Sequence, residues 1–164
     1  MEKERPVGVA VCGVVDNGKI LLIKRIKEPY VGLWSLPGGK VEKNEHISEA
    51  ATREVREETG IESNFSELKS IVSEHLLEGG KINFHIILFF CILKLKNAKD
   101  ANEKDEGEVK WFDLLEIDKF KSEIIPSDFL LIKQAANQEE GRYYNCKIRK
   151  TGEKHELLLF EKLC

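Results

Sequence analysis

The hydrophobic positions of the chain fall into runs that predict β-strands. Apolar residues dominate four long runs, at positions 7–15, 20–26, 70–77 and 82–95. The run at 7–15 is rich in valine and alternates poorly, which is typical of a strand buried on both faces. Asn17 and Gly18 separate the first two runs, and this pair predicts a tight hairpin turn because both positions need a positive φ. A fifth, short strand is predicted at 109–112, and a final hairpin at 142–148 and 155–160.

Two segments have the spacing of helices. Between residues 46 and 59, Ala50, Ala51 and Val55 mark one buried face, and Gly60 is well placed to end the helix. Pro126 begins a second predicted helix that runs to about residue 137. The stretches 28–36 and 96–107 lack a regular apolar pattern and predict loops.

This order of elements predicts an α/β fold, with a mixed sheet between helices. At 164 residues, and without an internal repeat or a linker, the chain is expected to form a single domain over 1–164. Its core is expected at about 7–137, followed by a hairpin extension at about 141–161. The hairpin has three alternative roles: it covers a sheet edge, forms a homodimer interface, or walls a substrate pocket.

Composition narrows the class of protein. With 41% hydrophobic and 34% charged residues, the chain has the make-up of an ordinary globule. A formal net charge of −3 gives no sign of a broad basic surface, so a nucleic-acid partner is not expected. The first six residues lack an apolar stretch, and the longest apolar run, 86–93, is too short to span a bilayer. Four scattered cysteines without a C-x-x-C pair predict thiols in a reducing compartment, and hence a cytoplasmic protein without membrane contact.

The candidate chemistry lies in the first predicted helix. Glu54, Glu57 and Glu58 stand at i, i+3 and i+4, so they are neighbours on one helix face. On a helical wheel Glu54 and Glu58 fall within about 20° of the apolar Ile47, so they lean toward the protein body. Clustered carboxylates on a buried rim need a cation or a strongly hydrated cleft, and Mg²⁺ prefers such oxygen ligands. The alternative is a solvated acidic helix face.

The stretch 39–61, GKVEKNEHISEAATREVREETGI, resembles the Nudix box of the Nudix hydrolase family. The specified box positions are filled by Gly39, Glu45, Arg53, Glu54, Val55, Glu57, Glu58, Gly60 and Ile61. The resemblance covers about residues 7–131. It implies an α/β/α Nudix sandwich with a mixed sheet.

The resemblance also implies a metal-dependent catalytic site. Glu54, Glu57 and Glu58, beside Gly39, would hold Mg²⁺, with Mn²⁺ as the alternative. Glu54 would help to activate the attacking water.

Further catalytic roles follow from the same resemblance. Glu45 and Arg53 would form a pair that orients the loop and the helix. The general base varies in this family, so a later carboxylate, Glu106 or Glu108, is the alternative to Glu54. The other interpretation of those two residues is solvated loop charge.

Four residues are candidates for substrate binding. The backbone of Gly38 and Gly39 permits close approach of a diphosphate, although the pair is also compatible with a plain turn. Arg25 could reach a phosphate, but solvation at a strand end is the favoured interpretation. Trp34 could stack on a nucleobase or pack beside the glycine turn.

The implied reaction is hydrolysis of a nucleoside diphosphate linked to a further group X, which makes a nucleotide the expected small-molecule partner. No proline lies between Pro37 and Pro126, where many ADP-ribose enzymes carry one after the box. The sequence therefore favours a MutT-like pyrophosphatase of (deoxy)nucleoside triphosphates. An ADP-ribose or nucleotide-sugar pyrophosphatase is the first alternative, and a non-catalytic Nudix module for ligand sensing or protein binding is the second.

Overall fold

A computed structural model of the protein describes residues 5–97, 108–137, 140 and 142–163. The predicted loop at 96–107 lies almost wholly outside these residues, as do Glu106 and Cys164. No helix in the described part of the chain has the length and apolar composition that crossing a membrane would require.

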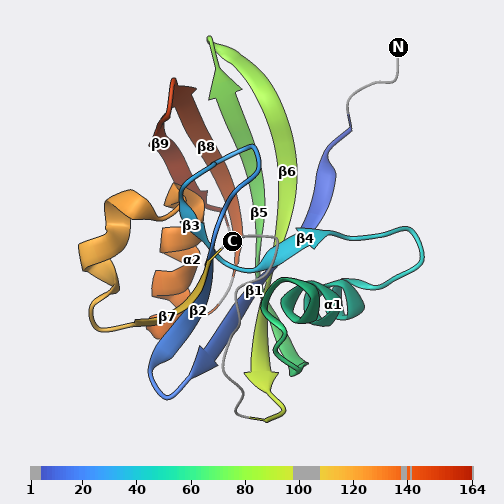
Figure 1. The fold of residues 1–164 in the computed structure, drawn as a ribbon. Helices are drawn as coiled ribbons and strands as arrows, with labels where there is room; N and C mark the ends of the chain where they lie inside the picture. The colour runs from blue at the N-terminus through green and yellow to red at the C-terminus, as the bar shows by residue number, and fades with distance from the viewer. Residues whose placement is uncertain (1–4, 98–107, 138–139, 141, 164) are drawn as a thin grey trace.

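The described elements are strands with two α-helices and one 3-10 helix between them (Figure 1). The strands are β1 (Val7–Asp16), β2 (Lys19–Lys24), β3 (Trp34–Ser35), β4 (Gly38–Lys40), β5 (Ser63–Glu78), β6 (Lys81–Leu95), β7 (Val109–Asp113), β8 (Tyr143–Thr151) and β9 (Lys154–Lys162). The helices are α1 (Ile47–Thr59), the 3-10 helix η1 (Ile117–Glu123) and α2 (Pro126–Ala136).

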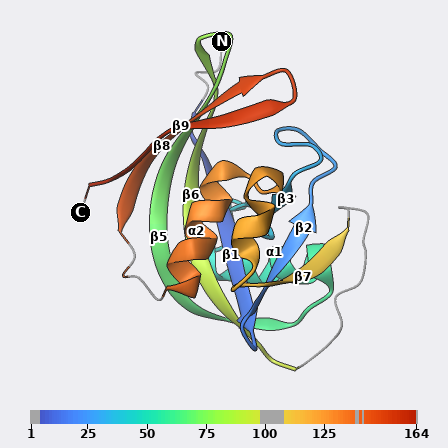
Figure 2. The ribbon, with the colours of Figure 1, turned by 90° about the vertical axis from the view of Figure 1, so that its left-hand side faces the viewer.

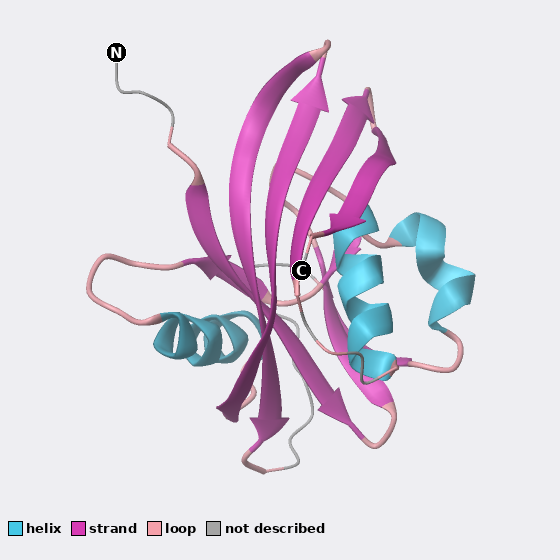
Figure 3. Cartoon of the chain, turned by 180° about the vertical axis from the view of Figure 1, so that it is seen from behind, coloured by secondary structure: helices cyan, strands magenta, loops and turns pink. Residues whose placement is uncertain are grey.

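The strands form a curled mixed sheet in the order β3-β2-β1-β6-β5-β8-β9, with β4 paired to β1 and β7 to β2. The pairs β1–β6 and β5–β8 are parallel, and the other pairs are antiparallel. Seen from behind, α1 lies on one side of the strands, and α2 with η1 lies on the other (Figure 3). The predicted α/β/α sandwich with a mixed sheet is confirmed.

Local sequence explains the elements that carry the site. Asn17 and Gly18 take φ angles of 46° and 75°, so the predicted β1–β2 turn is confirmed. At the start of α1, the Glu49 side chain accepts a hydrogen bond from the His46 backbone N–H at 2.7 Å. Gly60 ends the helix in the left-handed conformation at φ 74°, as its position predicts.

Two apolar clusters hold the layers together. One lies between the sheet and α1, and its buried members are Ala10, Cys12, Val14, Leu21, Ala50, Ala51, Val55, Ile61, Cys91 and Leu93. The larger cluster lies between the other face of the sheet and α2, and it includes Phe90, Leu131 and Ile132, which are fully buried. Because both clusters include residues of β1, this strand is held on both faces, as its valine-rich sequence predicts.

The sheet is more extensive than the sequence pattern predicts. Strand β5 begins at Ser63 rather than at residue 70, since two bulges break the apolar alternation of its first half while it pairs with β6. The short strands β3 and β4 lie in or beside the predicted loop, where they pair with β2 and β1. The terminal hairpin, β8 and β9, adds to the sheet through the β5–β8 pair, so it covers the edge of β5.

Candidate active site

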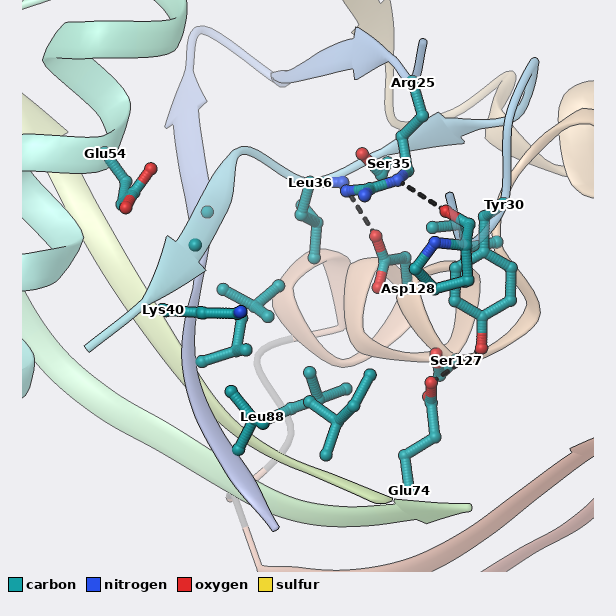
Figure 4. A pocket seen from close by; sticks show the side chains of 18 of the residues that line it. Arg25, Tyr30, Ser35, Leu36, Lys40, Glu54, Glu74, Leu88, Ser127 and Asp128 are labelled. Atoms are coloured by element: carbon teal, nitrogen blue, oxygen red, sulfur yellow. Dashed lines mark hydrogen bonds between the residues drawn. The ribbon is translucent and has the colours of Figure 1, made fainter. Parts of the chain in front are cut away.

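The structure has a cavity of about 690 Å³. Strand β4 and helix α1 form one wall, and the loop that joins β2 to β3 forms the opposite wall. The carboxylate face, defined here as Glu54, Glu57 and Glu58 of α1, lines one end. The buried acid end, defined as Glu74 of β5 and Asp128 of α2, lines the other. Figure 4 shows Glu54 on one side of this space, and Glu74 and Asp128 on the other. One hollow therefore joins two acidic regions that come from different parts of the chain.

The three carboxylates differ in their surroundings. Glu58 is 7% exposed, and its Oε2 accepts a hydrogen bond from the Gly38 N–H at 2.8 Å. The Glu54 side chain is 14% exposed, and burial raises the pKa of its carboxyl. The Glu57 side chain is 55% exposed. The predicted lean of Glu54 and Glu58 toward the protein body is therefore present.

The two glycines of β4 leave room that side chains would fill. A Cβ on Gly39 would lie 2.4 Å from the carboxyl carbon of Glu54. A Cβ on Gly38 would lie 2.1 Å from the carbonyl oxygen of Ala10, in the neighbouring strand. Glycine at these positions is what allows β4 to approach both the carboxylate face and β1.

Arg53 connects the carboxylate face to the loop before α1. Its guanidinium donates to Glu45 at 2.6 and 2.9 Å, to Glu54 at 2.7 Å and to Glu57 at 3.1 Å. A further bond reaches the backbone oxygen of Lys40 at 3.2 Å. The hydrogen bonds from Arg53 lower the pKa of Glu45 to about 2, so that carboxyl stays ionised at neutral pH. The structure thus brings the predicted pair Glu45 and Arg53 into direct contact.

The carboxylate face fits a hard divalent cation. All three side chains offer oxygen ligands to one cavity, and the missing side chain of Gly39 leaves the Glu54 carboxylate accessible from β4. Among the described residues, no three His, Cys, Asp or Glu side chains form a ready-made metal cage. Mg²⁺ does not need one, because it usually takes one or two carboxylates together with waters and substrate phosphates.

The buried acid end is held by hydrogen bonds to its two carboxyl groups. The Tyr30 hydroxyl donates to Glu74 Oε1 at 2.7 Å, and the Leu36 N–H donates to Asp128 Oδ2 at 2.8 Å. Glu74 is 2% exposed and Asp128 6% exposed. The hydroxyl of Ser35, also on the cavity wall, is buried without a hydrogen-bond partner in the described structure. A ligand that enters this end would therefore meet several hydrogen-bonding groups away from water.

Burial dominates the ionisation of this end. It raises the pKa of Glu74 and that of Asp128, the latter from 3.8 to about 7. The Leu36 N–H and the nearby Arg25 oppose the shift of Asp128, while Glu74 adds to it. Near neutral pH the Asp128 carboxyl is therefore in part protonated, and it can donate as well as accept a hydrogen bond.

Asp128 should make the protein less stable as the pH rises. Below pH 3.8 its carboxyl is protonated in both the folded and the unfolded chain, so its contribution to stability does not change with pH. Between pH 3.8 and about 7 the unfolded chain releases the proton more readily, so the free energy of unfolding falls, and the loss is complete above the folded pKa. Since a difference of one in pKa corresponds to about 1.4 kcal/mol, the total is a few kcal/mol.

The Asp128→Asn variant tests this expectation, since its amide oxygen can still accept from Leu36 but cannot ionise. Urea unfolding between pH 4 and 8 should give a smaller loss of stability for the variant than for the wild type, with the remainder due to Glu74. Asp118→Asn, at a side chain that is 65% exposed, serves as the matched control and should keep the wild-type slope. Equal slopes for wild type and Asp128→Asn would contradict the assignment.

Of the remaining residues that the sequence suggested for the site, only some line the cavity in the described structure. Arg25 lines it, and its Nε donates to the backbone oxygen of Pro29 at 2.9 Å. Trp34 is 5% exposed and packs edge-on against Phe112, with ring centroids 4.9 Å apart. The structure therefore places Trp34 in the core, which agrees with the packing alternative and corrects its proposed contact with substrate. Glu108 is exposed and does not line the cavity, while Glu106 lies outside the described residues.

Sequence reasoning did not find the buried acid end. Glu74 alternates with the apolar residues Val72 and Leu76, so an acidic residue on the core face of a strand was a signal that could have been used. Asp128 carried no such signal, because an acidic residue in the first turn of a helix is common without any role in binding.

Comparisons with known proteins agree with this arrangement. A NUDIX domain model matches residues 4–134, and the match ends before β8 and β9. The chain is 35% identical over 125 residues to an ADP-ribose pyrophosphatase from Methanocaldococcus jannaschii, which covers 74% of this chain and 72% of the relative.

Solved structures show the same fold. A mutator MutT protein from Bacillus halodurans aligns with a TM-score of 0.70 and 28% identity, over 94% of this chain and 96% of that chain. A bifunctional NMN adenylyltransferase/ADP-ribose pyrophosphatase from Francisella tularensis, in complex with AMP and a manganese ion, aligns with a TM-score of 0.65 and 20% identity. That alignment covers 84% of this chain and 43% of the other.

Proposed function

The chain belongs to the NUDIX domain family, a family of hydrolases that act on phosphoric anhydride bonds, and we propose that it cleaves the diphosphate of a nucleoside diphosphate linked to a further group X. The observation that carries this proposal is the cavity itself. Its carboxylate face and the two glycines of β4 lie at one end, and buried hydrogen-bonding groups lie at the other. The first end suits a metal-bound diphosphate, and the second suits an uncharged group rich in hydrogen-bond donors.

Nudix hydrolases generally use divalent metal ions, and the proposed ion here is Mg²⁺, with Mn²⁺ as the alternative. Glu54, Glu57 and Glu58 would hold it, beside the backbone of Gly39. When bound, the ion would neutralise the diphosphate and activate a water molecule.

The chain's own groups would orient this chemistry. The Glu54 carboxylate would accept a proton from the attacking water, and Arg53 holds it in place with a hydrogen bond of 2.7 Å. Arg53 also ties Glu45 to α1, so the loop before the helix and the helix keep one geometry. The paired glycines of β4 would let the diphosphate approach the backbone.

The two carboxyl groups of the buried acid end support one class of X, while the basic side chains Arg25, Lys27 and Lys40 also line the cavity. Two buried carboxyl groups disfavour a phosphate at the buried acid end, whereas the hydroxyls of a ribose or the amino groups of a base can donate to them. The archaeal ADP-ribose pyrophosphatase, at 35% identity, makes ADP-ribose the first substrate to test. A (deoxy)nucleoside triphosphate is the second, supported by the absence of a proline between Pro37 and Pro126 and by the MutT neighbour.

Product analysis separates these substrates. With Mg²⁺, ADP-ribose should yield AMP and ribose 5-phosphate, whereas a triphosphate should yield a monophosphate and pyrophosphate. The panel should also contain oxidised triphosphates, nucleotide sugars and dinucleoside polyphosphates, each with Mg²⁺, Mn²⁺ and chelator. We expect turnover that needs the metal and that favours ADP-ribose by at least about tenfold in kcat/KM, a difference of about 1.4 kcal/mol.

Preference for a triphosphate would reverse the order of the two substrates and keep the reaction class. Binding of a nucleotide without turnover, in every metal condition, would overturn the proposal and favour the non-catalytic module.

A further inference from the structure

The terminal hairpin reaches back to the loop between β2 and β3, residues 25–33, which lines the cavity (Figures 1 and 2). Lys150 of β8 forms an ion pair with Glu28 of this loop at 3.1 Å. The ring of His155 in β9 lies 4.8 Å from the ring of Tyr30, centroid to centroid. These contacts join segments more than 120 residues apart in the chain, as the Lys150–Glu28 separation of 122 shows.

The β2–β3 loop holds a backbone conformation that needs support. Tyr30 takes a φ of 72°, which is uncommon for a bulky residue and costs on the order of 1–3 kcal/mol. On its inner side the loop is tied by the bond from the Tyr30 hydroxyl to Glu74 and by that from Arg25 Nε to the oxygen of Pro29. On its outer side the loop contacts the hairpin, through the Lys150–Glu28 ion pair and the packing of His155 against Tyr30. Such a conformation persists only where the surroundings determine it, and the hairpin is part of those surroundings.

The position of this loop shapes the substrate cavity. Glu28, Pro29 and Tyr30 line the cavity directly, whereas no described residue of β8 or β9 does. Tyr30 also holds Glu74, one of the two carboxyls of the buried acid end. A shift of the loop would therefore change the end of the cavity that receives X and leave the carboxylate face untouched.

His155 supports the loop by packing rather than by charge. Burial lowers the pKa of its imidazole, so the neutral ring faces Tyr30. Its Nε2 is buried without a hydrogen-bond partner among the described residues. An unpaired buried nitrogen disfavours this position, so packing against Tyr30 and a hydrogen bond to the Glu153 backbone hold the ring there.

We propose that the terminal hairpin is a specificity element, in which Lys150 and His155 position the β2–β3 loop and thereby set the fit of the group X at the buried acid end. The inference rests on the proposed function, and it assigns to the hairpin a role beyond covering the edge of β5. Lys150 and His155 are positioning residues, since they act through Glu28 and Tyr30.

Kinetics with two substrates that share the diphosphate but differ in X provide the first test. Lys150→Met and His155→Ala should raise KM for the preferred substrate by about 5- to 20-fold with kcat within about threefold, which corresponds to about 1–2 kcal/mol of binding. The ratio of kcat/KM between the two substrates should fall by at least about fivefold. Lys150→Arg and His155→Phe keep the charge and the ring respectively, so they should restore most of the selectivity.

Arg149→Met is the matched control. Arg149 neighbours Lys150 and also forms an ion pair, but its partner is Glu156 within the hairpin. This variant should keep the wild-type selectivity ratio within about twofold, since only contacts inside the hairpin are lost.

Hydrogen exchange supplies a test that does not depend on turnover. The Arg25, Gly32 and Leu33 amides donate hydrogen bonds within the loop, at 2.9, 2.8 and 3.2 Å. Their exchange should become at least about fivefold faster in Lys150→Met and His155→Ala, while that of α1 stays unchanged. If Lys150→Met does not fold, Glu28→Gln breaks the same ion pair from the loop side and takes its place.

The outcomes separate the two proposals. Absence of turnover in the wild type would refute the proposed function, whereas the exchange of the loop would still report the support by the hairpin. Unchanged loop exchange, or a loss of kcat/KM that is equal for all substrates, would overturn the role of the hairpin in specificity and leave the reaction class standing.

Discussion

Replacing Glu57 by glutamine should lower kcat by at least about 100-fold while it leaves the fold intact. The substitution removes one negative charge from the carboxylate face at almost constant shape, and losing one group that stabilises transition-state charge typically lowers kcat by about 10²–10³. The side chain is 55% exposed and has one described ion pair, with Arg53 at 3.1 Å. Its loss should therefore change the free energy of unfolding by less than about 1 kcal/mol. Steady-state rates in saturating Mg²⁺, together with thermal unfolding, measure the two effects.

Glu67→Gln is the matched control for this variant. The Glu67 side chain is 54% exposed and pairs with Lys69 at 3.8 Å, so its exposure and pairing resemble those of Glu57. It lies on β5 outside the cavity, and its variant should keep the wild-type rate. A Glu57→Gln enzyme with near-wild-type kcat would remove Glu57 from the proposed metal site.

Replacing Gly39 by alanine should abolish most activity without unfolding the protein. The new Cβ would lie 2.4 Å from the carboxyl carbon of Glu54 and 2.4–2.6 Å from its oxygens, so the carboxylate must move. The end of a glutamate side chain can rotate away, which is why the fold should survive. A displacement of about 1 Å at a reacting group can lower the rate by about 100-fold. We expect a loss of that size in kcat/KM, with a melting temperature close to that of the wild type.

Alanine substitutions at two other glycines, Gly38 and Gly8, serve as comparisons for Gly39→Ala. At Gly38 a Cβ would lie 2.1 Å from the backbone oxygen of Ala10, which cannot rotate away, so Gly38→Ala should destabilise the fold by several kcal/mol. At Gly8 a Cβ would meet the Phe89 ring at an ordinary 3.4 Å, and Gly8→Ala should be wild-type-like in rate and stability. If Gly39→Ala were as unstable as Gly38→Ala, or as active as Gly8→Ala, the proposed displacement of Glu54 would be wrong.

The carboxylate face could be predicted because it lies in one continuous stretch of sequence. Helical spacing places Glu54 and Glu58 toward the protein body, and Glu58 is indeed 7% exposed. The contact between Glu45 and Arg53 spans eight residues across one loop and one helix, and the resemblance to the Nudix box already implied it.

The buried acid end could not be predicted, because it depends on packing between distant elements. Tyr30, Glu74 and Asp128 come from a loop, a strand and a helix, and no local pattern shows that these meet. Trp34 illustrates the same limit: an aromatic residue beside a glycine turn is compatible with stacking on a base or with burial. Its contact with Phe112 decides for burial. Bulges in β5 likewise obscured the alternation that would have extended that strand to Ser63.

The hydrogen bonds at the two ends of the cavity join residues at very different separations in the sequence, which affects the order in which the two ends are expected to fold. On the carboxylate face the Arg53–Glu45 and Gly38–Glu58 bonds close loops of 8 and 20 residues. At the buried acid end the Tyr30–Glu74 and Leu36–Asp128 bonds close loops of 44 and 92 residues. The Lys150–Glu28 bond of the hairpin closes a loop of 122 residues. Longer loops lose more chain entropy on closure, and non-local contacts slow folding. We therefore expect the carboxylate face to take shape before the buried acid end, and the contact of the hairpin with the β2–β3 loop to form last.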